Sequence, residues 1–339
     1  MKTIKVAMVG NGHDHSAANF RAMKNHPETF EIVGVCDLIP GKDEKTYEGA
    51  KRFSVDELLA LPDLDAVVIE SGKDSEVYYG QKFAEKGIPI FLDKPGSSNV
   101  EEYNKLLDIV EEKKLPFGLG YVYRFNPMVK NALELKNSGE LGEVYSVEAH
   151  MSVFHDRNKR RWLKTFKGGM MFYLGCHIID VACLFMGFPD EVIPLSTSTG
   201  NDGIDCEDFG CAILKYSNGS AYVRTCASEV NGFARRSITV TGTKGTVQIY
   251  PTEQHISSCD TDLDLISKAR ITLLKEHPNQ WGFGGTEYTS DPFNRYAPML
   301  LQFAAQVRGE EGYVMPLDYE RKLMKTLALA CGADNEMKR

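Results

Sequence analysis

Short apolar runs alternate with amphipathic stretches from the start of the chain to Tyr123. The apolar runs have the length of buried strands, and the stretches between them repeat apolar residues at helical spacing. Strands are predicted at Lys5–Val9, Phe30–Cys36, Ala66–Glu70, Ile88–Leu92 and Phe117–Val122. Helices are predicted at His15–Asn25, Val55–Ala60, Ser75–Lys86 and Val100–Lys113, the last with Asn99 as its N-cap. This alternation predicts βαβ units and a doubly wound parallel sheet over residues 1–123.

The pattern changes after Arg124, where longer strands with alternating apolar and polar residues appear. They are predicted at Val144–Val153, Glu191–Thr197, Phe209–Tyr216, Ser220–Ala227, Ser237–Thr241 and Thr246–Tyr250. Ser217-Asn218-Gly219 and Gly242–Gly245 are hairpin signals between pairs of these strands. Helices are predicted at Met170–Met186, Pro298–Arg308 and Leu317–Ala333, whereas Asp260–Ser290 shows no clear pattern. We therefore expect an α/β protein whose second domain, residues 124–339, has a large, mostly antiparallel open sheet.

The composition is that of a globular protein of two domains, with 339 residues and 42% hydrophobic positions. The net charge of −8 and the absence of a long basic run argue against nucleic acid or an anionic membrane as a partner. No apolar stretch approaches the roughly 18 residues that a membrane span needs. The first strand leaves no room for a signal peptide, and the eight cysteines form no C-x-x-C pair. We expect a cytoplasmic protein.

Asp93-Lys94-Pro95 closes the fourth predicted strand. In open parallel sheets the ligand crevice lies at the carboxyl ends of the strands, so Lys94 falls where chemistry is expected. Pro95 fixes one backbone dihedral and ends the strand. The alternative is a lysine at a strand end that simply faces water.

Gly10-Asn11-Gly12 follows the first strand and opens the first helix. Glycines at this point let the backbone turn sharply and approach a pyrophosphate at the helix N-terminus. Asp37 ends the second strand, where a carboxylate can accept both hydroxyls of an adenosine ribose and would repel a 2′-phosphate. The pattern favours NAD over NADP. The alternative for Asp37 is a residue that starts the turn before Leu38.

His15 stands where the third glycine of such a loop is usual. Either the helix starts with a shifted approach to the strand, or His15 turns into the crevice near the cofactor. His13-Asp14-His15 can also be interpreted as a metal site. We predict no metal, because no partner group of ligands at suitable spacing is evident elsewhere.

Paired glycines, Gly168 and Gly169, open the long helix of the second domain. They suit a place where another group approaches the backbone. Tyr173 and His177 are four residues apart and share one helix face, and Asp180 could orient the imidazole. The alternative is a buried amphipathic helix with an ordinary core tyrosine and histidine.

These motifs resemble those of the Gfo/Idh/MocA family, and the resemblance covers nearly the whole length. The matching segments are Gly10-x-Gly12, Asp93-Lys94-Pro95 for the family's Glu-Lys-Pro, Tyr123–Pro127, Gly168–Asp180, Gly242–Thr246 and Tyr296–Arg308. The resemblance implies a Rossmann domain followed by an α/β domain that often forms homodimers or homotetramers. It also implies oxidation or reduction of sugars, polyols and related compounds with NAD or NADP.

By position, the resemblance assigns catalytic roles to Lys94 and His177. Two residues depart from the family pattern: Tyr173 replaces an aspartate, and Glu76 replaces a histidine. His177 is suited to accept the hydroxyl proton of a secondary alcohol, and Lys94 to stabilise the oxygen. We hypothesise that Tyr173, activated by Lys94, acts as an acid or proton relay.

The predicted cofactor site consists of Gly10, Asn11, Gly12, His13, His15, Asp37, Glu70, Ser71, Lys94 and Pro95. The predicted substrate site consists of Tyr121, Tyr123, His155, Arg157, Arg161, Trp162 and Asp180. Trp162 offers a flat face for a sugar ring, and arginines bind hydroxyls or carboxylates. The alternative for the segment around Arg161 is a solvated basic loop. Tyr288 and Arg295 are weaker candidates.

Three functions remain open from the sequence. The first is an NAD-dependent dehydrogenase or reductase of a sugar, polyol or glycoside. The second is a glycosidase-like lyase or hydrolase in which NAD transiently oxidises a ring hydroxyl before elimination. The third is a nucleotide- or sugar-sensing protein without catalysis, against which Lys94 and His177 argue.

Overall fold

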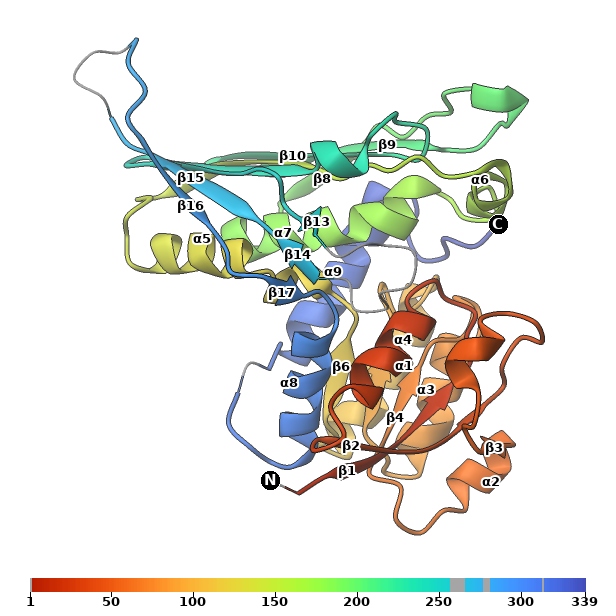
Figure 1. Cartoon of the computed structure of the whole chain (residues 1–339). Coiled ribbons are helices and arrows are strands. Elements are labelled where there is room, and N and C mark those ends of the chain that lie inside the picture. The colour runs from red at the N-terminus through yellow and green to blue at the C-terminus, as the bar shows by residue number, and fades with distance from the viewer. Residues whose placement is uncertain (1, 257–265, 277–280, 313) are drawn as a thin grey trace. The chain divides into compact units, whose positions relative to one another are not determined.

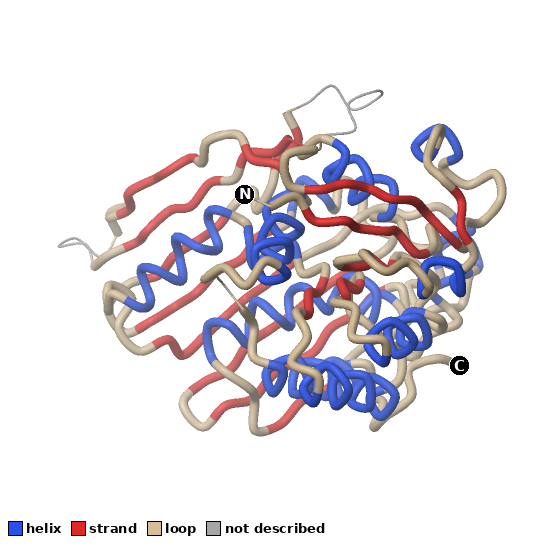
Figure 2. The backbone as a smooth tube through the Cα atoms, turned by 90° about the horizontal axis from the view of Figure 1, so that it is seen from below, coloured by secondary structure: helices blue, strands red, loops and turns tan. Residues whose placement is uncertain are grey.

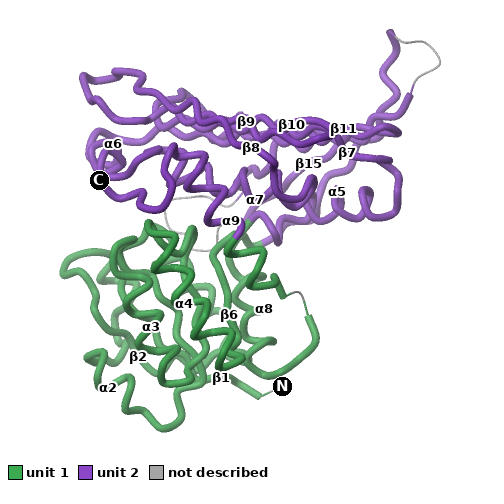
Figure 3. The backbone as a smooth tube through the Cα atoms, turned by 180° about the vertical axis from the view of Figure 1, so that it is seen from behind, with its two compact units in different colours: residues 1–122, 257–265, 294–321 green, residues 123–256, 266–293, 322–339 purple. Residues whose placement is uncertain are grey.

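The computed structural model describes residues 2–256, 266–276, 281–312 and 314–339. They group into two compact units, shown in green and purple in Figure 3. The first unit contains the residues up to Val122 together with Asn294–Arg321, and the second contains the remainder. Helix α8 (Ala297–Val307) therefore belongs to the first unit, although the sequence placed this segment in the second domain.

The first unit is built on a six-stranded parallel sheet with the strand order β3-β2-β1-β4-β5-β6. Its strands are β1 (Ile4–Val9), β2 (Phe30–Cys36), β3 (Arg52–Phe53), β4 (Ala66–Ile69), β5 (Ile90–Leu92) and β6 (Phe117–Leu119). The central strands β1 and β4 are buried almost throughout, because helices cover both faces of such a sheet. The predicted doubly wound fold is confirmed.

Helices connect these strands and pack in pairs on the sheet (Figure 1). They are α1 (Ser16–Lys24), α2 (Val55–Leu59), α3 (Glu76–Glu85), α4 (Val100–Glu112) and α8. Helix α1 packs against α8, and α3 packs against α4. The Asn99 side chain accepts from the Glu102 backbone N–H at 3.0 Å, which confirms the predicted N-cap of α4.

The second unit is built on an eight-stranded sheet with the order β16-β15-β12-β11-β7-β10-β9-β8. Its strands are β7 (Val144–His150), β8 (Glu191–Pro194), β9 (Phe209–Tyr216), β10 (Gly219–Cys226), β11 (Ser237–Gly242), β12 (Thr246–Ile249), β15 (Arg270–Leu274) and β16 (Gly285–Thr289). Neighbouring strands run antiparallel except β7 and β10. The mostly antiparallel sheet and both predicted hairpins, β9–β10 and β11–β12, are confirmed.

Helices α5 (Pro127–Asn137) and α7 (Cys176–Met186) pack on one face of this sheet (Figure 1). Tyr145 and Tyr222 on β7 and β10 are exposed, as expected for strands with one solvated face. The remaining elements are α6 (Arg157–Leu163), α9 (Leu317–Ala330) and a small sheet of β13 (Gln254–His255), β14 (Ile266–Lys268) and β17 (Phe293–Asn294). Figure 2 shows helices in blue and strands in red.

Several predicted boundaries were wrong. The last strand of the first sheet ends at Leu119 instead of Val122, and α5 was not predicted although Asn126 caps it and Pro127 begins it. The segment from Arg157 to Leu163 is a helix capped by Asp156, not a loop. Strands β15 and β16 lie within Asp260–Ser290, of which residues 260–265 and 277–280 are outside the described residues.

Two further observations concern the whole described chain. None of its helices is both long and apolar enough to cross a membrane. The seven cysteines among the described residues are buried, and none of them forms a disulfide with another of these seven.

Candidate functional site

The carboxyl ends of four parallel strands meet in register at one edge of the first sheet. Val9 pairs with both Cys36 and Ile69, and Ile69 pairs in turn with Leu92. The residues that follow these positions are therefore at one level across the sheet, and they are Gly10, Asp37, Glu70 and Asp93. This edge is where ligands bind in open α/β folds. The predicted cofactor residues of four separate segments are thus brought together.

The loop after β1 passes so close to the loop after β4 that two of its positions, Gly10 and Gly12, have no room for a side chain. Gly10 has a φ of +78°, and a Cβ on it would lie 2.7 Å from the Ser71 Cα. A Cβ on Gly12 would lie 2.7 Å from the Gly72 backbone nitrogen. Only glycine fits either position, because the opposing atoms belong to the backbone.

Asn11 ties this loop to the loop after β2. Its amide nitrogen donates to the Lys42 carbonyl at 2.9 Å, and its carbonyl oxygen accepts from the Ile39 N–H at 2.6 Å. The Lys42 ammonium donates to the Gly12 carbonyl at 2.8 Å. The side chains of this loop therefore hold its shape, and helix α1 begins directly after it at Ser16. A helix N-terminus beside tightly turned glycines fits a pyrophosphate.

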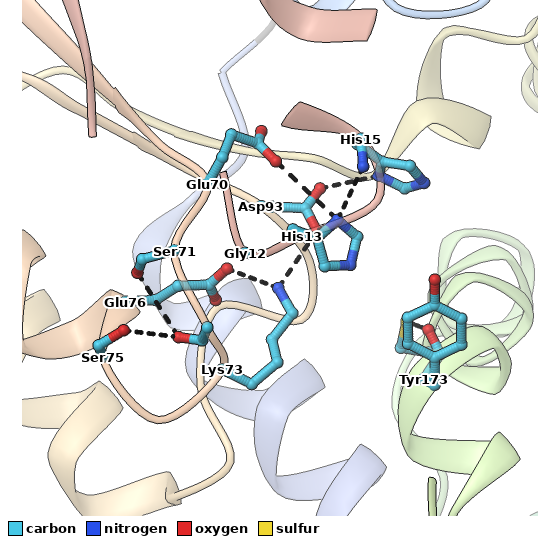
Figure 4. A network of polar contacts seen from close by, with 12 residues as sticks. Gly12, His13, His15, Glu70, Ser71, Lys73, Ser75, Glu76, Asp93 and Tyr173 are labelled. Atoms are coloured by element: carbon cyan, nitrogen blue, oxygen red, sulfur yellow. Dashed lines mark hydrogen bonds and ion pairs between the residues drawn. The ribbon is translucent and has the colours of Figure 1, made fainter. Parts of the chain in front are cut away.

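Asp93 is the centre of a buried polar network that the sequence did not predict (Figure 4). One carboxylate oxygen lies 2.7 Å from His13 Nδ1 and 3.2 Å from the Lys73 ammonium, and the other lies 3.0 Å from His15 Nδ1. Three loops, those after β1, β4 and β5, are joined through this one side chain. His15 thus turns inward onto Asp93.

Two more carboxyl groups belong to the network. The Lys73 ammonium lies 2.6 Å from Glu76 Oε1, and the Asn19 amide donates to Glu70 at 2.5 Å. Both carboxyl groups and the Asp93 carboxylate are fully buried. Glu76, at the position where the resemblance implies a histidine, is thus buried beside Lys73.

Burial and neighbouring charges set the proton positions in this network. Burial raises the pKa of Glu76 to about 8 and raises the pKa of Glu70 well above its usual range. Burial also lowers the pKa of His13 and of His15. Burial alone would raise the pKa of Asp93, but the neighbouring imidazoles and Lys73 outweigh it and hold the pKa well below its usual range.

The charges of the network balance near neutral pH. These pKa shifts favour an ionised Asp93, a charged Lys73, protonated carboxyl groups at Glu70 and Glu76, and neutral imidazoles at His13 and His15. A low-dielectric interior tolerates such a paired state, but it does not tolerate several uncompensated charges. Because an ionised carboxylate can only accept, each imidazole Nδ1 donates to Asp93.

His13, His15 and Asp93 also have the composition of a metal site, since their ligand atoms lie within 4.8 Å of one another. The Asp93 carboxylate already accepts hydrogen bonds from the Lys73 ammonium and from two imidazole N–H groups. A divalent cation would have to displace these protons and would lie beside a lysine. The prediction of no metal stays a prediction.

The other predicted cofactor residues lie around the same edge. Asp37 is exposed, has a φ of 51° and accepts a hydrogen bond from Tyr79 at 2.6 Å. Lys94 is 1% exposed and is joined to Pro95 by a cis peptide bond. Tyr121, a predicted substrate residue, is buried in this unit as well.

Three predicted residues of the second unit form a cluster around one lysine. The Lys159 ammonium lies 4.0 Å from the ring centroids of both Trp162 and Tyr173. The two rings meet edge to face at 5.4 Å, and the His155 ring lies 5.8 Å from Tyr173. Sequence reasoning missed Lys159, although a cation three residues before an aromatic residue on a helix can reach its ring.

His177 lies in a second cluster of the same unit. The predicted helix begins with a π-helical turn over Met171–Gly175, and His177 follows in α7. Its ring packs edge to face on Tyr123 at 5.4 Å. The Tyr123 hydroxyl donates to Glu253, and Arg236 donates to the same hydroxyl at 3.1 Å. Glu253 also contributes to the wall of a mostly apolar pocket of about 550 Å³ with Phe233, Ala234, Tyr250, Pro251, Gln254 and His255.

Asp180 has a partner that the sequence analysis did not consider. Its carboxylate accepts three hydrogen bonds from the Arg124 guanidinium at 2.9–3.2 Å, and both side chains are buried. The paired geometry makes Asp180 a counter-ion of Arg124. Arg157 and Arg161 are exposed on α6.

Comparisons with known proteins place both parts of the chain in one family. Residues 4–121 match the family described as "Oxidoreductase family, NAD-binding Rossmann fold", and residues 129–248 match the "GFO/IDH/MocA C-terminal domain". The chain is 30% identical over 211 residues to D-xylose 1-dehydrogenase (NADP(+)) 2 of Haloferax volcanii, covering 56% of this chain and 64% of the relative.

A second relative is the 2,7-anhydro-N-acetylneuraminate hydratase of Mediterraneibacter gnavus. It is 25% identical, over 74% of this chain and 68% of the relative. The chain spans slightly less than two thirds of the length of the curated relatives it matches first. An oxidoreductase from Agrobacterium radiobacter, solved with NAD+, L-tartaric acid and magnesium, shares the fold with a TM-score of 0.76 and 18% identity. That match covers 98% of this chain and 95% of the other.

Proposed function

The chain belongs to the Gfo/Idh/MocA oxidoreductase family, and we propose that it transfers a hydride between NAD and a secondary hydroxyl or ketone of a sugar, polyol or glycoside. The proposal rests chiefly on the register of the first sheet. It brings the glycine-rich loop, Asp37 and the Asp93-Lys94 strand end to one edge. The name of the xylose dehydrogenase relative supports the substrate class.

The residues at this edge fit a dinucleotide. Gly10 and Gly12 let this loop turn tightly against Ser71 and Gly72, and helix α1 begins shortly after it at Ser16. The exposed Asp37 carboxylate suits two ribose hydroxyls and disfavours a 2′-phosphate, which selects NAD over NADP. When bound, the nicotinamide accepts or returns the hydride.

The predicted cofactor residues form two groups: those that face the dinucleotide and those that hold the loop in place. Gly10, Asn11, Gly12 and Ser71 form the surface of the loop, and Asp37 binds the ribose. His13, His15 and Glu70 direct their side chains into the buried network, so they hold the loop in place and contribute through their backbone groups. Lys94 and Pro95 follow the network directly in sequence.

We assign the chemistry to three side chains. Lys94 binds the substrate oxygen and stabilises its negative charge during oxidation. His177 accepts the hydroxyl proton, for which imidazole is suited near neutral pH. Tyr173 acts as an acid or proton relay, and the Lys159 ammonium lies 4.0 Å from the centroid of its ring. Trp162 and His155, which contact Tyr173, and Tyr123, which contacts His177, contribute to substrate binding.

A second candidate is a reaction without net redox change, in which a transient oxidation permits elimination and hydration. The relative named as a hydratase favours it, because hydration changes no overall oxidation state. Such a reaction would regenerate the cofactor in every cycle.

We further propose a homodimer or homotetramer formed through the exposed face of the second sheet, on which Tyr145 and Tyr222 lie. Aromatic residues at the surface of a sheet are typical of such interfaces. Buried cysteines that form no disulfide within the described part of the chain support a reducing, cytoplasmic location.

One experiment separates these functions. Purified protein is incubated with NAD+ and a panel of sugars, polyols and aryl glycosides, while reduced nicotinamide and released aglycone are followed together. Net reduced nicotinamide supports the dehydrogenase. Aglycone release or hydration without net reduced nicotinamide supports the redox-neutral reaction, and inactivity on the whole panel with tight NAD+ binding contradicts both.

A further inference from the structure

Asp37 and Tyr79 form a hydrogen bond between two elements of the first unit. Asp37 follows β2, and Tyr79 lies in the first turns of α3. The Tyr79 hydroxyl donates to Asp37 Oδ2 at 2.6 Å. Asp37 adopts the left-handed backbone conformation with a φ of 51°, which aspartate tolerates better than most residues. The turn therefore fixes the backbone of Asp37, and the Tyr79 hydroxyl holds its carboxylate.

The phenol leaves most of the carboxylate available. An ionised aspartate offers about four lone-pair positions, and Tyr79 uses one of them. The other oxygen, Oδ1, and the remaining position on Oδ2 can accept two vicinal hydroxyls. Burial and the bond to Asp37 raise the pKa of Tyr79, so the hydroxyl stays a donor over the physiological range.

We propose that Tyr79 is a positioning residue that fixes Asp37 for the two hydroxyls of the adenosine ribose and thereby sets the preference for NAD over NADP. The inference rests on the proposed function. An exposed aspartate without an anchor can rotate away from a 2′-phosphate and so weaken the discrimination. With Tyr79 in place the carboxylate stays where the phosphate would have to lie, and the like charges repel.

One lysine of the same loop, Lys42, is already engaged. Lys42 donates its ammonium to the Gly12 carbonyl at 2.8 Å. A lysine or arginine beside the ribose is what usually accommodates a 2′-phosphate. Because Lys42 is bonded to the glycine-rich loop, its charge is turned away from the carboxylate that Tyr79 holds.

Calorimetric titration of the full chain with NAD+ and with NADP+ tests the inference without any turnover. Tyr79→Phe removes only the hydroxyl. We expect it to weaken NAD+ binding by about tenfold, the loss of one hydrogen bond to a charged group. NADP+ affinity is expected to stay equal or to rise, so the ratio of the two affinities falls by at least about tenfold. The matched control is Tyr78→Phe, because Tyr78 is the exposed neighbour on the same helix.

A double-mutant cycle with Asp37→Ala shows whether Tyr79 acts through Asp37. In the Asp37→Ala background, Tyr79→Phe is expected to change neither affinity. A full effect of Tyr79→Phe in that background, or an unchanged affinity ratio in the single variant, would overturn the inference while leaving the proposed function intact. Failure of the unmodified protein to bind either nucleotide would overturn both.

Discussion

The His13 Nδ1 atom lies 2.7 Å from Asp93 Oδ2, inside the first unit and out of contact with water. This pair connects the glycine-rich loop after β1 to the strand end that carries Lys94. The cofactor loop and the lysine expected to act on the substrate are therefore held by the same carboxylate. Their relative placement depends on Asp93 as well as on the glycines.

Replacing Asp93 with Asn leaves Lys73 without its buried counter-charge. Removing one partner of a buried ion pair is expected to cost about 3 kcal/mol in the free energy of unfolding. Urea unfolding of the variant and of the unmodified chain measures the difference. Lys215→Met at the exposed pair with Glu191 is the control, for which a loss of less than about 1 kcal/mol is expected. Equal losses of unfolding free energy in the two variants would show that the buried network stabilises the protein no more than an exposed ion pair does.

Glu76 gives stability a defined pH dependence. The folded protein keeps the Glu76 proton up to a pKa of about 8, whereas the unfolded chain releases it at the usual value near 4.5. Between these values stability falls as the pH rises, by up to about 1.4 kcal/mol per pH unit from this group, and above about pH 8 the contribution is gone.

Glu76→Gln removes the titrating proton. Relative to the unmodified protein the variant should therefore gain stability steadily as the pH is raised from about 5 to about 8. Chemical unfolding across this range measures the difference, with the exposed Glu48→Gln as the control. A difference that stays constant with pH would contradict a buried, protonated Glu76.

Gly12→Ala tests the close approach of two loops. The new Cβ would lie 2.7 Å from the Gly72 nitrogen, so the backbone must move. We expect NAD+ affinity to fall by at least about tenfold in calorimetry. Gly87→Ala, at a helix end with open space around it, is expected to cost about 1 kcal/mol of stability and to leave NAD+ affinity unchanged. Unaltered affinity in Gly12→Ala would place the dinucleotide elsewhere.

Tyr173→Phe tests the residue that departs from the family aspartate. The ring contacts with Trp162 and Lys159 survive this change, and only the hydroxyl is lost. Turnover should fall by more than about tenfold, with substrate and NAD+ affinities little changed, if the hydroxyl moves a proton. Tyr145→Phe on the exposed sheet face serves as the control. Near-normal turnover would exclude Tyr173 from the chemistry.

The parts of the fold that could be predicted are those in which the spacing of apolar residues or a local turn signal determines the element. The strands of the first sheet are apolar because both faces are buried, and the hairpin at Asn218-Gly219 has a local signal. Strand β16 could not be predicted, since the exposed side chains of Gly285–Thr289 carry no apolar pattern. Helix α5 had readable signals in Asn126 and Pro127.

The site was predicted only where residues border strand ends. Gly10, Asp37 and Lys94 could be placed because parallel strands end at one edge. The partners of Asp93 could not, because Lys73 and His13 come from other loops and no local pattern encodes their contact. Asp180 also accepts hydrogen bonds from the buried Arg124 guanidinium, a partner that no local pattern in the sequence indicates. Ion pairs between residues of different elements can be identified only once the tertiary structure is known.

The proposed hydride transfer is tested most directly by single-turnover formation of reduced nicotinamide. The protein is mixed with NAD+ and each sugar or polyol of the panel, and the absorbance of reduced nicotinamide is followed beside that of Lys94→Met. We predict that at least one compound gives a rapid rise in the unmodified protein, slowed at least about hundredfold in Lys94→Met. No rise with any compound, or an equal rise in the variant, would contradict the proposal.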